Sequence, residues 1–155
     1  MRTIIVYDSV FGNTADIARA IAAACQSAGP ARLVPVAETG DLDLSDIDLL
    51  IVGSPTRGFN ATPAINEFLS GLPQSAPGLR AAAFDTRMAK EAIHPAPLRW
   101  VVEAGGYAAQ RIAHALEGKG FALADTAGFE VTGQEGPLKP DELAHASAWA
   151  HRLAA

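Results

Sequence analysis

A group of small polar residues follows the first apolar segment of the chain. Ile4–Tyr7 is a short apolar run, and Ser9, Gly12, Asn13 and Thr14 come soon after it. A helix that begins at this point presents free backbone N–H groups at its positive end. The hydroxyls and the amide can donate further hydrogen bonds, and a glycine lets the backbone approach a ligand closely. The pattern predicts a site that holds a phosphate dianion without any lysine or arginine.

Two other kinds of phosphate loop are excluded by the same residues. The nucleoside triphosphate loop needs a lysine after its last glycine, and this segment has none. The dinucleotide pattern G-x-G-x-x-G is also missing. A terminal monophosphate therefore fits better than a triphosphate or a pyrophosphate. Helix capping is the simpler reading of these residues, but it accounts for only one or two of them.

Two further polar segments follow later apolar runs. Gly53–Asn60 comes directly after Leu49–Val52, and Asp85–Arg87 comes directly after Leu79–Phe84. The carboxyl ends of parallel strands meet at one edge of a sheet, which is where open α/β sheets bind their ligands. We therefore expect all three polar segments to surround a single ligand.

These segments resemble the flavodoxin family. Its hallmark is an aromatic residue and a Ser/Thr-rich turn that ends in Gly-x-Thr after the first strand, matched here by Tyr7, Ser9, Gly12, Asn13 and Thr14. Flavodoxin-like proteins also often carry Gly-Ser-Pro-Thr after the third strand, as Gly53–Thr56 does here. The resemblance covers essentially the whole chain and is closest to the short-chain type. It implies an FMN cofactor, electron transfer without a catalytic acid or base from the protein, and transient redox protein partners.

The resemblance places the flavin on three loops. The first loop is expected to bind the phosphate, and the other two are expected to frame the ring and the ribityl chain. The residues concerned are Ser9, Val10, Phe11, Gly12, Asn13, Thr14, Ser54, Pro55, Thr56, Arg57, Gly58, Phe59, Asn60, Asp85, Thr86 and Arg87.

The ring end of the site departs from the family pattern. Flavodoxins usually hold the ring between two aromatic side chains, but Arg57 stands where the first is commonly found. Phe59 is near enough to replace it, and Trp100 or Tyr107 could supply the second ring. Arg57 and Arg87 are equally compatible with solvated surface positions. If either lies near the flavin, it favours the anionic reduced ring, so we hypothesise that the reduced flavin forms more easily here than in strongly acidic flavodoxins.

The elements that position these loops alternate between strands and helices. The predicted strands are Ile4–Tyr7, Leu33–Val36, Leu49–Val52, Leu79–Phe84 and Gly128–Thr132, and the predicted helices are Thr14–Ala28, a segment starting at Thr62-Pro63, Ala108–Leu116 and a terminal segment starting at Pro140. This alternation predicts an α/β fold in three layers, with a five-stranded parallel sheet of order 2-1-3-4-5 and helices on both faces. One domain is expected over residues 1–155. Asp85–Gly106 is predicted to be a long irregular loop, and both Trp100 and Trp149 are predicted to be packing residues.

Composition excludes several other classes of function. Hydrophobic residues make up 49% of the chain, the formal net charge is −5, and no basic cluster suits nucleic acid. The apolar run at the N-terminus is too short for a signal or a membrane span, so we expect a cytoplasmic protein that binds no membrane. The single cysteine, Cys25, is predicted to be a buried hydrophobe, and the four histidines show no metal-binding spacing. We expect a monomer rather than a dimer. Two alternatives stay open: an FMN-dependent NAD(P)H:quinone-type oxidoreductase, and a flavodoxin-fold interaction module without flavin.

Overall fold

A single five-stranded sheet forms the centre of the molecule. The computed structural model describes residues 1–155, and its strands are β1 (Thr3–Tyr7), β2 (Ala31–Pro35), β3 (Leu49–Pro55), β4 (Arg80–Met88) and β5 (Ala122–Val131). All neighbouring strands are parallel, in the order β2-β1-β3-β4-β5. The predicted strand order is therefore confirmed, and the order reverses between β1 and β3, where such sheets bind ligands.

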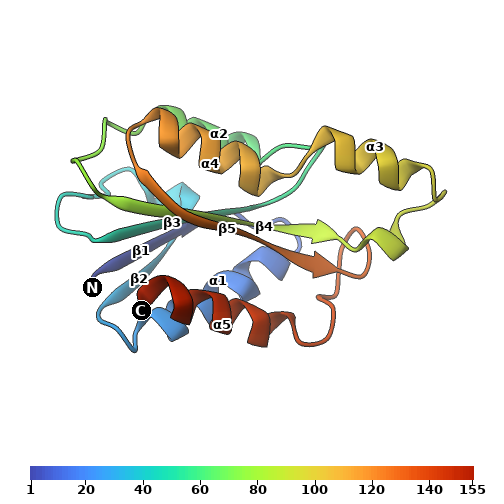
Figure 1. The fold of residues 1–155 in the computed structure, drawn as a ribbon, viewed down its shortest axis with the longest axis horizontal. Helices are drawn as coiled ribbons and strands as arrows, with labels where there is room; N and C mark the ends of the chain where they lie inside the picture. The colour runs from blue at the N-terminus through green and yellow to red at the C-terminus, as the bar shows by residue number, and fades with distance from the viewer.

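Helices cover both faces of this sheet (Figure 1). On one face α1 (Asn13–Cys25) packs with α5 (Glu142–Ala154) over a core that includes Ile5, Ile51 and Phe84. On the other face α2 (Pro63–Ser70) and α4 (Ala108–Gly118) cover a second core. The central strands are buried on both sides because each face has its own helical layer.

Local signals explain where several helices begin. The Thr62 side chain accepts a hydrogen bond from the Ile65 N–H, and Pro63 follows at the first position of α2. Gly12 precedes α1 with a φ of 98°, a left-handed conformation that glycine adopts at little cost. The polar loop before α1 therefore turns sharply into the helix at the carboxyl edge of the sheet.

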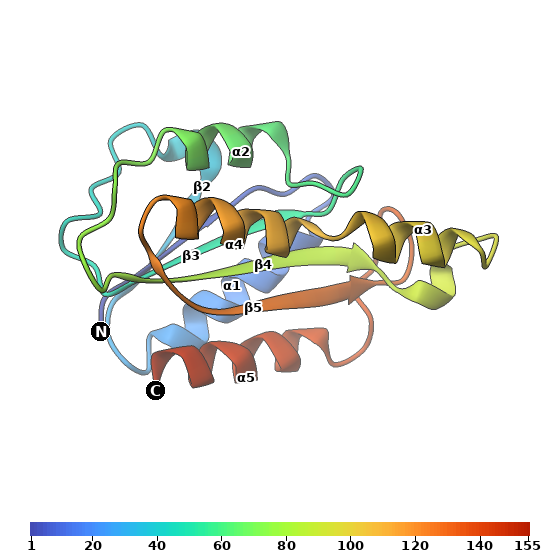
Figure 2. The same cartoon turned by 45° about the horizontal axis from the view of Figure 1, so that its top comes forward.

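The prediction for Asp85–Gly106 is wrong. Strand β4 continues through Asp85 and Thr86 to Met88, and the rest of the segment contains a short 3-10 helix, η2 (Lys90–Ala92), and helix α3 (Leu98–Gly105). The polar side chains remain in the strand because β5 pairs with this part of β4 through register pairs such as Asp85 with Gly128. Figure 2 shows α3 projecting beyond the carboxyl end of β4.

Smaller differences concern strand ends, the second crossover and one tryptophan. Strand β2 begins at Ala31 and β5 begins at Ala122, both earlier than their apolar runs suggest. The crossover from β2 to β3 holds only the short helix η1 (Val36–Glu38). Trp149 is buried as predicted, but Trp100 is 85% exposed and packs against little of the protein.

No helix is both long and apolar enough to cross a lipid bilayer.

Candidate functional site

Two adjoining cavities open at the carboxyl edge of the sheet. The first, here called the inner cavity, has a volume of about 270 Å³ and lies against the loop between β1 and α1. The second, here called the apolar cavity, has a volume of about 440 Å³ and lies under α3. Thr56, Gly58, Arg87 and Met88 line both, so the two cavities are neighbours. Ligand sites in proteins commonly have volumes of this order.

Most of the predicted site residues line these cavities. Ten border the inner cavity, namely Val10, Phe11, Asn13, Thr14, Pro55, Thr56, Arg57, Gly58, Thr86 and Arg87, and Phe59 borders the apolar cavity. The remaining five are Ser9, Gly12, Ser54, Asn60 and Asp85, which line neither. The three loops thus come together as the sequence indicates.

The loop between β1 and α1 carries unpaired donors on residues that line the inner cavity. The backbone N–H groups of Val10, Phe11, Asn13 and Thr14 donate to no other protein atom. Ser9 Oγ accepts from the N–H of Gly12 at 3.1 Å and from that of Ala15 at 3.3 Å, so its side chain holds the loop in shape. Free N–H groups at a helix start form an anion-binding cradle. The structure therefore contains donors that suit a phosphate group.

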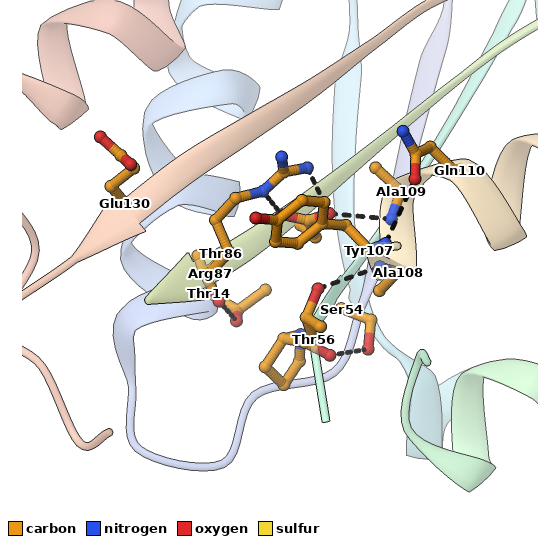
Figure 3. Close-up of polar contacts among 12 residues, drawn as sticks. Thr14, Ser54, Thr56, Thr86, Arg87, Tyr107, Ala108, Ala109, Gln110 and Glu130 are labelled. Atoms are coloured by element: carbon orange, nitrogen blue, oxygen red, sulfur yellow. Dashed lines mark hydrogen bonds and ion pairs between the residues drawn. The ribbon is translucent and has the colours of Figure 1, made fainter. Parts of the chain in front are cut away.

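A pair of hydroxyl groups lies behind this loop. Thr14 Oγ1 and Thr86 Oγ1 are 2.7 Å apart, and both residues are buried (Figure 3). One hydroxyl donates to the other, so one hydroxyl hydrogen of the pair stays available to a ligand. Both residues border the inner cavity, which places this donor beside the free backbone N–H groups.

Asp85 and Arg87 form an ion pair inside the wall of the site. Asp85 is fully buried, and its two carboxylate oxygens each accept from Arg87, from Nε and Nη2, at 2.7 Å. The same carboxylate accepts from the Ala109 N–H at the start of α4, at 2.9 Å. Bidentate pairs of this kind are strong and fix the plane of the guanidinium. The alternative that Arg87 is merely a solvated surface charge is therefore wrong.

Arg57, in contrast, lies at the surface. Its side chain is exposed, and its guanidinium lies 5.6 Å from the centroid of the Phe11 ring. Backbone hydrogen bonds in both directions between Arg57 and Asn60 close a tight turn that also carries Gly58 and Phe59. This turn forms the rim of both cavities.

Hydrogen bonds between loops hold the rest of the site in place. Thr56 Oγ1 accepts from the Ala108 N–H at 2.9 Å, which joins the third-strand loop to α4. Ser54 Oγ is fully buried, donates to the Pro55 carbonyl and accepts from the Thr62 N–H. The polar side chain of Ser54 therefore supports the loop and does not face a ligand.

Sequence reasoning missed two parts of the wall. The last residue of β5, Val131, and the segment after it, with Gly133 and Gln134, contribute to the inner cavity. In the apolar cavity the missed residues are Ala92, Ile93, His94, Leu98 and Val102, which come from η2, α3 and the segments beside them. Tyr107, one of the two residues expected as a source of the second ring, lines this cavity as well. The four-residue spacing of Leu98 and Val102 is a helical signal within a segment read as a loop. The buried ring is Tyr107, whereas Trp100 borders neither cavity.

The largest cavity of the molecule lies elsewhere. Its volume is about 1120 Å³, and it runs between α2 and the connection from β2 to β3. None of the predicted site residues lines it. Its walls are apolar side chains and loop segments with scattered carboxylates, which do not suit an anionic ligand. The carboxyl-edge cavities are therefore the better candidate site.

Comparison with known proteins bears on the family and the fold of the chain. The family model described as a flavodoxin domain matches residues 4–94. No curated protein sequence matches the chain. A flavodoxin from the domain Archaea superposes with a TM-score of 0.73 at 18% identity, covering 99% of this chain and 96% of that one. The two-electron reduced flavodoxin of Megasphaera elsdenii superposes with a TM-score of 0.68 at 22% identity, covering 97% and 98%.

A larger protein contains the same fold. Rubredoxin oxygen:oxidoreductase from Desulfovibrio gigas superposes with a TM-score of 0.73 at 20% identity. The match covers 99% of this chain but only 35% of that protein. Likenesses at these identities concern the fold alone.

Proposed function

The chain belongs to the flavodoxin family, and we propose that it binds FMN at the carboxyl edge of its sheet and carries electrons between redox proteins. The observation that carries this proposal is the set of unpaired backbone N–H groups at Val10, Phe11, Asn13 and Thr14, which no protein atom uses. A phosphate dianion would accept from these groups without a cationic side chain.

The residues present fit the chemical groups of FMN. The β1–α1 loop and the Thr14–Thr86 hydroxyl pair would hold the phosphate. The turn from Arg57 to Asn60 and the wall at Arg87 would flank the ring. The flavin supplies the redox chemistry, and the protein binds it, orients it and sets its electrostatic surroundings. The proposal includes a monomeric chain in the cytoplasm that contacts redox partners transiently.

Titration of the apoprotein with FMN, followed by flavin fluorescence, tests the proposal, with riboflavin as the control. We expect tight FMN binding and much weaker riboflavin binding, since riboflavin has no phosphate for the loop to hold. Equal binding of the two flavins would contradict the role of the loop. No binding of either would overturn the electron-carrier proposal and favour an interaction module.

A second candidate function is an FMN-dependent NAD(P)H:quinone-type oxidoreductase. The observation that favours it is α3, which adds Leu98 and Val102 to a cavity beside the proposed ring position. Such an apolar wall suits a planar, largely apolar acceptor such as a quinone. Steady-state oxidation of NADH or NADPH by the FMN-loaded protein, with a soluble quinone as acceptor, separates the two functions. A carrier gives no appreciable turnover in this assay.

A further inference from the structure

The segment between β5 and α5 forms a compact turn, here called the β5–α5 hairpin and defined as Thr132–Pro137. The Thr132 N–H donates to the Pro137 carbonyl at 2.8 Å, and Thr132 Oγ1 donates to the same oxygen at 3.0 Å. The Gly136 N–H donates to the Gly133 carbonyl at 3.1 Å. These bonds within the turn hold its two arms together, so the hairpin can act as one rigid part.

The hairpin is attached to the first residue of α1. Asn13 Nδ2 donates to the Glu135 carbonyl at 3.0 Å, across 122 positions of sequence. Gly136 packs so closely on the same side chain that an added Cβ would lie 2.6 Å from Asn13 Oδ1. The Asn13 amide is thus directed to the hairpin, whereas the sequence suggested that it serves a phosphate.

This attachment brings the hairpin to the phosphate end of the proposed FMN site. Gly133 and Gln134 line the inner cavity together with Val10, Phe11 and Asn13 of the β1–α1 loop. A flavin monophosphate ends at that loop. A flavin dinucleotide continues beyond its first phosphate with a second phosphate and a nucleoside. These groups must extend out of the cavity at its phosphate end.

We propose that the β5–α5 hairpin, held by Asn13, closes this end of the cavity and selects a flavin monophosphate over a flavin dinucleotide. The inference rests on the proposed FMN site. Selection arises from obstruction, because binding the dinucleotide requires the Asn13–Glu135 bond to break and the hairpin to move. The monophosphate requires neither change.

The test compares the affinities of FMN and FAD for the wild-type apoprotein and three variants. Gly136→Ala forces a side chain against Asn13 at a φ of 103°, which displaces the hairpin, and Gly136 itself does not line the cavity. Asn13→Ala removes the bond to Glu135 directly. Gln26→Ala is the matched control, since Gln26 is exposed at the other end of α1.

The quantity measured is the ratio of the FAD and FMN dissociation constants. We expect the wild type and Gln26→Ala to favour FMN by at least about tenfold, and Gly136→Ala and Asn13→Ala to lower that preference by about tenfold. An unchanged ratio in both hairpin variants, or equal wild-type affinities for FMN and FAD, would overturn the inference while the FMN site stands. Failure of the wild type to bind either flavin would refute the FMN site itself.

Discussion

The guanidinium carbon of Arg87 lies 3.7 Å from the centroid of the Tyr107 ring. The guanidinium also packs against Gly128, where an added Cβ would lie 2.3 Å from the same carbon. Both Asp85 oxygens accept from its nitrogens, so the guanidinium has three contacts that fix its position. A cation in this position stacks on an aromatic face and keeps a fixed place beside the cavities.

Replacing Arg87 is expected to make the bound flavin harder to reduce. Arg87 borders both cavities, whereas Asp85 has no exposed surface, so the cation is nearer to a ring bound there. A nearby positive charge favours the anionic reduced ring. For Arg87→Gln we expect the affinity for reduced FMN relative to oxidised FMN to fall about tenfold, which lowers the two-electron potential by about 30 mV.

Potentiometric titration of the FMN-loaded protein measures this shift. Arg57→Gln serves as the control and should give a smaller change, because an exposed charge is screened by water and salt. Arg87→Lys keeps the charge but loses the bidentate geometry, so its potential should lie between those of wild type and Arg87→Gln. If the two-electron potential of all three variants equalled that of the wild type, this role for Arg87 would be ruled out.

Gly128→Ala is expected to destabilise the fold by displacing Arg87. The added methyl group would overlap the guanidinium, and moving the cation leaves Asp85 buried with fewer partners. Overpacking of this kind costs about 1–3 kcal/mol. Urea unfolding followed by circular dichroism gives the difference in the free energy of unfolding.

A matched glycine is available at the end of α4. Gly118 has open space where a Cβ would be added, so Gly118→Ala should leave the stability unchanged or raise it slightly. If Gly118→Ala lowered the free energy of unfolding as much as Gly128→Ala, the destabilisation would not come from the Arg87 contact.

Ser9→Ala is expected to weaken FMN binding by loosening the β1–α1 loop. The substitution leaves the Gly12 and Ala15 N–H groups without their shared acceptor, which costs about 1 kcal/mol. The FMN affinity should fall roughly fivefold or more, while riboflavin affinity should change little. Ser70→Ala, at an exposed helix end, is the control. Parallel losses for FMN and riboflavin would argue against a phosphate role.

Cys25 is expected to react slowly with thiol reagents in the folded protein. Its side chain is buried in the core between α1 and the sheet, and burial raises the pKa of the thiol above its usual value. The thiolate is therefore scarce near neutral pH, and its fraction increases only as the pH rises toward that higher pKa. The rate of modification by a disulfide reagent at pH 8, compared in native buffer and in denaturant, measures this protection; similar rates would contradict it.

Much of the fold follows from short-range patterns in the chain. The continuous apolar run Leu49–Val52 indicates a strand covered on both faces, and Thr62-Pro63 marks a helix start without any knowledge of the partner elements. Alternation of such elements leads to a parallel sheet, and the polar residues after β1, β3 and β4 then fall at one edge. These features depend on periodicity and capping, which neighbouring residues determine.

The tertiary structure alone decided how the polar residues of β4 and the distant loops are used. Asp85, Thr86 and Arg87 resemble a loop in sequence, but pairing with β5 and the Asp85–Arg87 ion pair satisfy their polar groups inside the sheet. The roles of Asn13, Tyr107 and Gly128 likewise arise from contacts with residues far away in the chain. The side chains of the cavity wall are positioned by residues that are distant in sequence and pack against them. The local sequence pattern does not identify those residues.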